Sequence, residues 1–294
     1  MAEKNKSKLT TTKSATFKKF LEAGKSGGRV LPHVDRHLLA RPRDNDRPTN
    51  VLHPSEMVRD DWCHRASYFL LQGAEPAEEP ASRRGLRTYV VFQTGHAIHD
   101  LWQSLFAKMG VLHGRWKCNQ CGYLDSIISN SPACPLHGSE TTWTYKEVPV
   151  RSKALRISGH ADGILTGFGE PLLLEIKSMG EGTFLFEDPV AWAAADRNYA
   201  KAWSSLQSPF LKHILQAQLY MKLLEGENLA PQEAVILYHS KGNNEYKEFI
   251  IQKSDFGIAP LLEAAKRVVD AVEAGTPPSC NVGGASGCAK CKEY

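Results

Sequence analysis

The sequence predicts an α/β domain, and three observations carry this prediction. The first is the stretch 158–179, which has the pattern of two strands joined by a tight Gly- and Pro-containing turn at 167–171. The second is an amphipathic helical pattern at 213–227, and the third is the mostly apolar strand at 233–240 that follows it. Strands that alternate with helices in this way favour an α/β fold.

Composition limits the class of protein. A chain of 294 residues can hold one large domain with insertions or two modest ones. Hydrophobic residues make up 42% of the chain and charged residues 23%, as in ordinary globular proteins. No apolar run approaches the roughly 20 residues that span a bilayer, and the N-terminus has no apolar signal-peptide core. We therefore expect a cytoplasmic protein with no membrane partner.

The net charge of +4 is unevenly distributed. Residues 1–50 hold 12 Lys and Arg against 5 Asp and Glu, and the rest of the chain holds 24 against 27. This predicts a basic tail at 1–50 that is too polar for a core of its own. Such a tail can contact nucleic acid phosphates, and an inert solubilising leader is an equal alternative.

Two helices are expected before residue 110. The first begins at Pro54 and carries an apolar face to about Leu70, and the second follows Gly85. His96 and His99 are three residues apart on the second helix, so they occupy neighbouring positions. Most helix histidines are structural or solvated, so a ligand role needs further support.

A zinc ribbon is predicted as an insertion at 115–140. Cys118 and Cys121 form a CxxC motif, and after twelve intervening residues Cys134 and His137 form a CxxH motif. Two such knuckles fit a tetrahedral Zn²⁺ site with no open position, which is a structural site. Seven cysteines in an intracellular chain also favour metal ligands over disulfides.

The hairpin at 158–179 carries candidate catalytic groups. Alternate residues of a strand share a face, so Glu175 and Lys177 point the same way, and Asp162 lies on the partner strand. Two carboxylates and an ammonium are costly to bury unless they hold a metal ion, and carboxylates suit Mg²⁺ or Mn²⁺. A solvated hairpin face with a surface ion pair is the alternative.

The chain then contains a helical insertion at 180–210 that can cover the active face, strands at 233–240 and 246–252, and a final helix within 254–274. Aromatic residues of the insertion can stack on unpaired bases or simply pack in the core; these are Trp192, Tyr199, Trp203 and Phe210. Gln216 and Tyr220, at i and i+4, share one face of the helix at 213–227.

The C-terminal segment 276–294 holds Cys280, Cys288 and Cys291 in a Gly-rich sequence that is too polar to form a core. Three cysteines need a fourth ligand, and the one left unassigned is Cys63. A Cys₄ set from both ends of the domain can bind an iron–sulfur cluster or zinc and join the termini. A loose tail with free thiols is the alternative.

These residues together resemble the RecB-like branch of the PD-(D/E)XK nucleases, especially CRISPR-adaptation-type iron–sulfur exonucleases and their phage-encoded relatives. The resemblance spans roughly 54–291 and rests on the shared order of several weak motifs. In chain order these are Cys63 in WCHRASYF, His99 in GHAIH, Glu147 in EVPV, Asp162 in GHADGIL, Glu175 and Lys177 in EIK, Gln216 and Tyr220 in QxxxY, and the terminal cysteines.

The resemblance implies a restriction-endonuclease-like fold at 51–294, with a mixed central sheet flanked by helices. It also implies a metal-dependent exonuclease that acts on single-stranded DNA or DNA ends in recombination, repair or processing, in a bacterial or phage-infected cell. Its implied Mg²⁺ or Mn²⁺ ligands are His99, Asp162, Glu175 and the Ile176 carbonyl. Its implied catalytic residues are Lys177, Asp162, Glu175, Gln216 and Tyr220, with a 4Fe–4S cluster or zinc at Cys63, Cys280, Cys288 and Cys291.

Three features depart from the family pattern. Ala161 replaces the proline of the family name, the terminal spacing C-x7-C-x2-C lacks a last cysteine, and the ribbon is not expected in the minimal fold. Because of the terminal spacing, the cluster of Cys63 with the terminal cysteines can hold 4Fe–4S, zinc or no metal. Two other functions also stay open: a non-catalytic DNA-binding or adaptor module, and a restriction-type endonuclease. Strand polarity and a homo-oligomeric state are not determined by the sequence.

Overall fold

The computed structural model describes residues 28, 30–40, 48–74, 85–292 and 294, which form two compact units. Of the described residues, those within 1–44 and 78–91 belong to the first unit, and those within 45–77 and 92–294 belong to the second. Most of the expected basic tail at 1–50 lies outside the described residues; within it the structure has the helix α2 (Leu31–Leu39). Asp35 of α2 accepts a hydrogen bond from the backbone N–H of Leu86, where helix α5 (Leu86–Lys108) begins.

The second unit is built on a mixed five-stranded sheet with the order β1-β6-β7-β8-β9. Strands β7 and β8 are parallel and the other neighbours are antiparallel. The strands are β1 (Leu112–His113), β6 (Gly163–Leu165), β7 (Leu172–Met179), β8 (Glu233–Ser240) and β9 (Tyr246–Gln252). The predicted fold class, a mixed central sheet flanked by helices, is confirmed.

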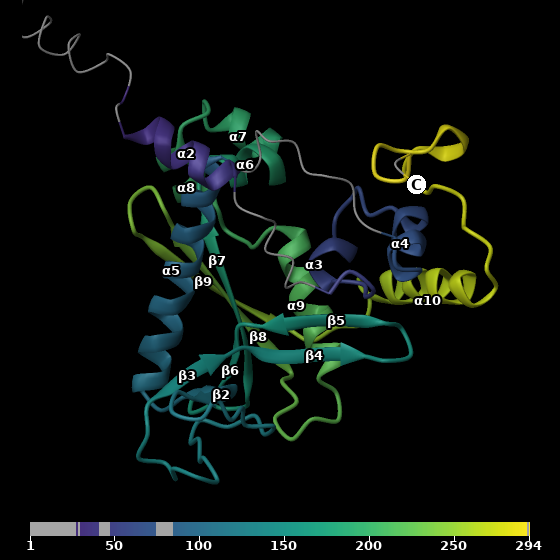
Figure 1. Cartoon of the computed structure of the whole chain (residues 1–294). Helices are drawn as coiled ribbons and strands as arrows, with labels where there is room; N and C mark the ends of the chain where they lie inside the picture. The colour runs from purple at the N-terminus through teal and green to yellow at the C-terminus, as the bar shows by residue number, and fades with distance from the viewer. Residues whose placement is uncertain (1–27, 29, 41–47, 75–84, 293) are drawn as a thin grey trace, which may run out of the picture. The chain divides into compact units, whose positions relative to one another are not determined.

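Helices cover both faces of this sheet (Figure 1). On one face Ile98 of α5 packs with Leu174, Ile176 and Leu237. The opposite face packs against helix α9 (Leu211–Leu223), whose buried face includes Ala217 and Met221. Each fully buried aliphatic side chain contributes about 1.5–3 kcal/mol of transfer free energy, so this two-sided burial holds β7 and β8 rigidly in place.

The sequence predicted one strand from Ser158 to Leu165, and the structure divides it at Asp162. Strand β5 (Ile157–Ala161) pairs with β4 (Val148–Ser152), whereas β6 pairs with β1 and β7. A side chain on Gly163 would clash, because an added Cβ would lie 2.5 Å from Leu112 Cδ1. The chain thus passes from the β4–β5 sheet to the five-stranded sheet at Asp162, which lies between the two sheets.

The expected helix from Pro54 is also divided, into α3 (Pro54–Met57) and α4 (His64–Leu71). These helices pack with α10 (Ala259–Glu273) in a second cluster of buried residues. Residues 181–205 form three short helices, α6 (Glu181–Glu187), α7 (Pro189–Ala194) and α8 (Tyr199–Ser205). The remaining elements are the two-stranded sheet of β2 (Arg115–Cys118) and β3 (Trp143–Lys146) and a 3₁₀ turn at Gly284–Ser286.

Among the described residues, none of the helices combines the length and apolar character that a membrane span requires.

Candidate functional site

Asp162 is held from several directions at the break between β5 and β6. Its Oδ2 accepts a hydrogen bond from the backbone N–H of Ile176 at 2.5 Å, and its Oδ1 lies 3.0 Å from His99 Nδ1. Its backbone carbonyl accepts hydrogen bonds from Gln103 Nε2 at 3.0 Å and from the Tyr145 hydroxyl at 2.9 Å. The side chain is therefore fixed in position, which a group that binds an ion needs.

Glu147 joins Asp162 and His99 in one cluster. One ligand atom from each of the three residues lies within 4.8 Å of the others, and together they can hold a divalent metal ion. The sequence resemblance includes Glu147 as part of the EVPV motif and does not imply a ligand role for it. The register explains its position: Val148 pairs with Ala161, so the antiparallel pairing places Glu147 beside Asp162. The sequence shows an acidic residue next to an apolar strand. Only the β4–β5 register identifies this residue as a candidate ligand.

Glu175 and Lys177 lie next to this cluster on β7. They share a face of the strand, and Lys177 Nζ forms an ion pair with Glu175 Oε1 at 2.5 Å. Glu175 is only 2% exposed, and its Oε2 has no hydrogen-bond partner among the described residues. A buried carboxylate oxygen without a partner is destabilising, and a bound cation would satisfy it. The donor set thus fits a hard divalent ion, which prefers oxygen ligands.

Helix α9 contributes the next contacts. Lys177 Nζ donates a hydrogen bond to Gln216 Oε1 at 3.1 Å, and Gln216 Nε2 donates to the Tyr220 hydroxyl at 2.9 Å. Both α9 side chains are buried. The structure therefore connects the four residues Glu175, Lys177, Gln216 and Tyr220 in one chain of polar contacts from β7 to α9.

The carboxylates of this site are electrostatically crowded. Burial and the neighbouring charge of Asp162 raise the pKa of Glu147 to about 7. Burial also raises the pKa of Glu175 to about 7, and Asp162 adds to this rise while Lys177 opposes it. Burial by itself would lower the pKa of His99, but the Asp162 hydrogen bond and the surrounding carboxylates raise it overall. A site that resists three negative charges favours a cation in the same space.

The four ligands of the predicted ribbon come together on the surface. Sγ of Cys121 is 3.6 Å from Sγ of Cys134, and His137 Nδ1 is 3.6 Å from Cys118 Sγ and 3.5 Å from Cys134 Sγ. Tetrahedral Zn²⁺ with its usual bond lengths separates such ligand atoms by about 3.5–3.8 Å. Despite its burial, the Cys118 thiol has its pKa lowered to about 6 by backbone hydrogen bonds from Cys121 and Gln120, which favours the ligating thiolate.

Cys63 meets the terminal cysteines in a second cluster, as the count of unassigned cysteines predicted. Its Sγ lies 3.7 Å from that of Cys280, and the sulfurs of Cys288 and Cys291 are 3.8 Å apart. All four sulfurs lie within 4.8 Å of one another. The backbone N–H of Gly283 donates to Cys280 at 3.1 Å and lowers the pKa of that thiol to about 6. Each of the two Cys/His clusters can thus bind zinc or an iron–sulfur centre.

The C-terminal segment docks on the start of α4 around this second cluster (Figure 1). Asn281 accepts a hydrogen bond from the backbone N–H of His64 at 2.8 Å and donates one to the Trp62 carbonyl at 2.9 Å. Lys290 forms an ion pair with Asp61 at 3.0 Å. The polar tail is therefore tied down by specific contacts beside its cysteines.

The aromatic residues at 192–210 do not form a stacking platform. Trp203 is 2% exposed, and Trp192 and Phe210 are also buried in the core cluster over the α9 face of the sheet. Tyr199 packs against the same cluster and donates its hydroxyl to Ser240 at 2.8 Å. The structure therefore favours core packing over base stacking as the role of these residues.

Comparison with known proteins found matches among solved structures but none among sequences. No family model matches the sequence, and no curated protein sequence matches it. The fold is similar to the crystal structure of SSO0001, with a TM-score of 0.37 and 14% identity over 84% of this chain and 87% of that one. It is also similar to the alkaline exonuclease LHK-Exo of Laribacter hongkongensis, with a TM-score of 0.40 and 11% identity over 78% of this chain and 90% of that one. The structure of LHK-Exo in complex with dAMP gives a TM-score of 0.41 and 13% identity over the same shares. At these scores the functional proposal rests on the chemistry of the site and not on the similarity.

Proposed function

We propose that this protein is a divalent-metal-dependent deoxyribonuclease of the RecB-like type. The observation that carries the proposal is the cluster of His99, Glu147 and Asp162, with Glu175 and Lys177 beside it on β7. Oxygen and imidazole ligands next to one lysine suit the hydrolysis of a phosphodiester, whose transition state carries extra negative charge. The order of the sequence motifs, which resembles that of the RecB-like nucleases, favours DNA as the substrate.

The metal ligands in this proposal are His99, Asp162, Glu175 and the Ile176 carbonyl, with Glu147 as an additional carboxylate. When bound there, Mg²⁺ or Mn²⁺ supplies Lewis acidity and lowers the pKa of water. Asp162 can keep its position during this chemistry because four groups already hold its carboxylate and carbonyl. The unpartnered Oε2 of Glu175 is the oxygen that such an ion would engage.

Lys177 is the group we assign to the attacking water. An ammonium has three N–H donors, and Glu175 and Gln216 accept two of them. The third N–H is left to hold a water molecule or a phosphoryl oxygen. Gln216 fixes the direction of the ammonium, and the Tyr220 hydroxyl fixes Gln216. This arrangement places the lysine without relying on its own flexible side chain.

The two Cys/His clusters have structural roles in this proposal. Cys118, Cys121, Cys134 and His137 hold Zn²⁺ in the ribbon. At the second cluster, sulfurs within 4.8 Å of one another favour a single tetrahedral zinc ion. In a 4Fe–4S cluster each cysteine binds a different iron at the corner of a cube, which needs wider sulfur spacing. Either metal would join the C-terminal segment to α4.

The domain organisation follows from these assignments. Residues 51–294 form the nuclease domain, with the ribbon insertion at 115–140, the helical insertion at 180–210 and the cysteine-rich tail at 276–294. The basic segment 1–50 contributes sequence-independent attraction to the DNA backbone. We propose action as an exonuclease at DNA ends or on single strands, in recombination, repair or processing, in the cytoplasm of a bacterial or phage-infected cell.

Cleavage of end-labelled DNA tests the proposal. Linear and circular substrates, single- and double-stranded, are incubated with Mn²⁺ or Mg²⁺ and with the wild-type protein or its Lys177→Ala variant. We expect wild type to degrade linear DNA and the variant to be slower by at least about 10²-fold, the usual loss when a group that stabilises transition-state charge is removed.

Lys212→Ala is the matched control, because Lys212 lies on the same helix as Gln216 but forms its ion pair with Glu187, which is not a proposed metal ligand. It should cleave at nearly the wild-type rate. Cutting of circular DNA at internal sites would replace exonuclease with endonuclease action. No cutting by wild type that retains its cysteine-bound metals would refute the proposal and favour a DNA-binding module.

A further inference from the structure

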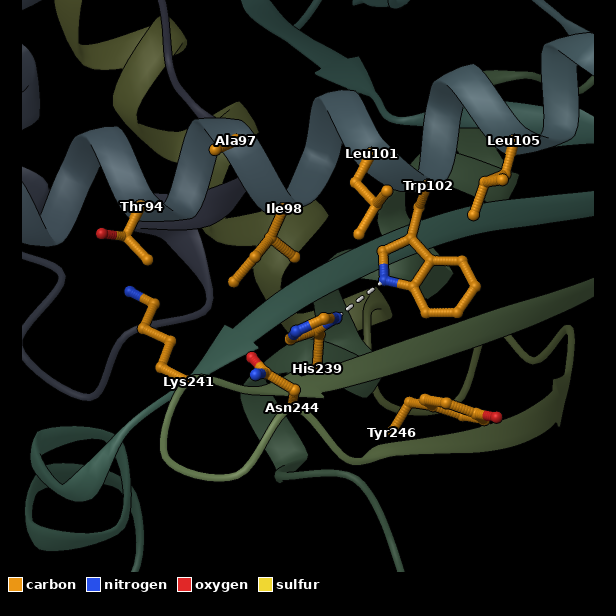
Figure 2. Close-up of a pocket in the computed structure, with 10 residues that line it drawn as sticks. All are labelled: Thr94, Ala97, Ile98, Leu101, Trp102, Leu105, His239, Lys241, Asn244 and Tyr246. Atoms are coloured by element: carbon orange, nitrogen blue, oxygen red, sulfur yellow. Dashed lines mark hydrogen bonds between the residues drawn. The ribbon is translucent and has the colours of Figure 1, made fainter.

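A pocket lies between α5 and the ends of β8 and β9, and His99 is not among the residues that line it (Figure 2). Its volume is about 530 Å³, within the range of small-molecule sites. None of the residues proposed for metal binding or catalysis lines it. The pocket is thus a separate feature of the surface.

The pocket has a polar end and an aromatic end. Thr94, Lys241 and Asn244 lie together at one end, and Trp102 and Tyr246 lie at the other (Figure 2). The Trp102 and Tyr246 rings are 5.6 Å apart between centroids at an angle of 79°, so they form two walls of a corner. Tyr246 is 67% exposed, which leaves much of its ring available to a ligand.

His239 lies between the two ends and has a fixed tautomer. Its Nδ1 is 3.1 Å from Trp102 Nε1, and an indole nitrogen can only donate, so Nδ1 must be the acceptor. The neutral ring then carries its proton on Nε2. His239 is only 7% exposed, and no described residue accepts a hydrogen bond from Nε2. Nε2 is not one of the buried atoms that lack a partner, so it is open to solvent although most of the ring is buried. In a residue that lines a pocket, such a donor is available to an acceptor atom of a ligand.

We infer that this pocket binds one nucleotide unit. Its phosphate is placed at Lys241 and Asn244, its base against Trp102 and Tyr246, and an acceptor of the base or sugar at His239 Nε2. A nucleotide has the same polarity as the pocket, with an anion at one end and a flat aromatic ring at the other. The choice of a nucleotide over other aromatic anions rests on the proposed function. The polarity of the pocket and the donor at His239 are observed independently of that function.

Two sources can supply this unit: a free mononucleotide, such as a reaction product, or one nucleotide of a bound DNA strand. Both present the same phosphate and base to the pocket. They differ in the rest of the strand, which adds backbone contacts only in the second case. Separate binding measurements with dAMP and with a single-stranded decamer distinguish them.

The test is equilibrium dialysis with labelled dAMP and with the labelled decamer, in a Lys177→Ala background so that the decamer is not cut. Tyr246→Leu and Lys241→Met should each weaken binding by about tenfold, because one base–aromatic stack or one phosphate-facing cation is lost. Tyr246→Phe keeps the ring and should change binding by less than about twofold. Phe256→Leu removes an aromatic ring that is 92% exposed outside the pocket and should also have no effect.

Each outcome has one meaning. Weakened binding of dAMP, of the decamer or of both supports the inference and identifies the source. No binding of either ligand, or equal affinities across all folded variants, would overturn it. Thermal melts verify that each variant is folded. Failure of the proposed nuclease is seen separately, as absent cleavage by wild type, and does not alter these binding results.

Discussion

Lys177 of β7 donates a hydrogen bond to Gln216 of α9, with 3.1 Å between Nζ and Oε1. Gln216 is in turn held by the Tyr220 hydroxyl through its amide group. The direction of the lysine ammonium therefore depends on a helix that comes about forty residues later in the chain.

The first prediction concerns this contact. Gln216→Leu should lower kcat for DNA cleavage by about 10- to 100-fold with a small change in KM, because the lysine remains but loses its orientation. Tyr220→Phe removes only the hydroxyl that holds Gln216 and should cost less. Steady-state kinetics on a single-stranded substrate would check both. A Gln216→Leu variant with wild-type kcat would show that the lysine needs no such support.

The second prediction concerns Glu147. Because its pKa is raised to about 7, the carboxyl group is largely protonated below that pH and must lose its proton to bind a cation. Affinity for Mn²⁺, measured by calorimetry without DNA, should therefore rise as the pH increases from about 6 to about 8. Glu147→Gln should weaken binding by about tenfold or more and flatten this pH dependence. Equal affinity of the variant and the wild type would exclude Glu147 as a ligand.

The third prediction separates the two Cys/His clusters with a matched pair of variants. Cys63→Ser and Cys121→Ser remove the same atom from different clusters, so each should lose only its own metal, as counted by elemental analysis. Cys63→Ser should also lower Tm, since metal binding there contributes folding free energy and joins α4 to the tail. A Cys63→Ser protein with unchanged metal content and Tm would contradict the proposed link between the termini.

The fourth prediction connects the ribbon to Asp162. Tyr145 lies opposite Trp116 in the β2–β3 pair, two residue pairs from Cys118, and its hydroxyl donates a hydrogen bond to the Asp162 carbonyl. Loss of the ribbon metal should loosen this pair and release Asp162. Tyr145→Phe and Cys121→Ser should each reduce cleavage, and their combination should cost less than the sum of the two effects. Strict additivity in that double-mutant cycle would show that the ribbon acts elsewhere.

The fifth prediction concerns acid stability. Burial, together with the charges of Lys177 and Lys212, lowers the pKa of His213 to about 2, and its Nδ1 is hydrogen-bonded to the Tyr238 hydroxyl at 2.6 Å. Only the unfolded state then binds a proton as pH falls below about 6.5, so this residue's contribution to stability is full above that pH and is lost progressively toward pH 2. At about pH 5, protonation of His213 in the unfolded state should lower the free energy of unfolding by about 2 kcal/mol.

Denaturant unfolding at several pH values would measure this effect. His213→Asn keeps an acceptor for Tyr238 but does not titrate, so its unfolding free energy should fall less steeply between about pH 7 and pH 5. A wild-type slope in the variant would assign the acid sensitivity to other groups.

The sequence by itself determined the features that depend on neighbours along the chain. Strand alternation placed Glu175 and Lys177 on one face, helical spacing placed Gln216 above Tyr220, and knuckle spacing defined the ribbon ligands. These patterns hold wherever the element lies, because they follow from backbone geometry. Counting the unassigned cysteines also identified Cys63 as the partner of the C-terminal set, and the structure confirms that cluster.

Only the tertiary structure decided which distant groups meet. It divided the predicted strand at Asp162, placed Glu147 beside it through the β4–β5 register, and left His239 with a free donor in the α5 pocket. Such contacts depend on strand register and on how helices pack across a sheet, and a shift of one residue would exchange the faces of a whole strand. Local patterns carry no information about that choice, since it is fixed by the burial of the core as a whole.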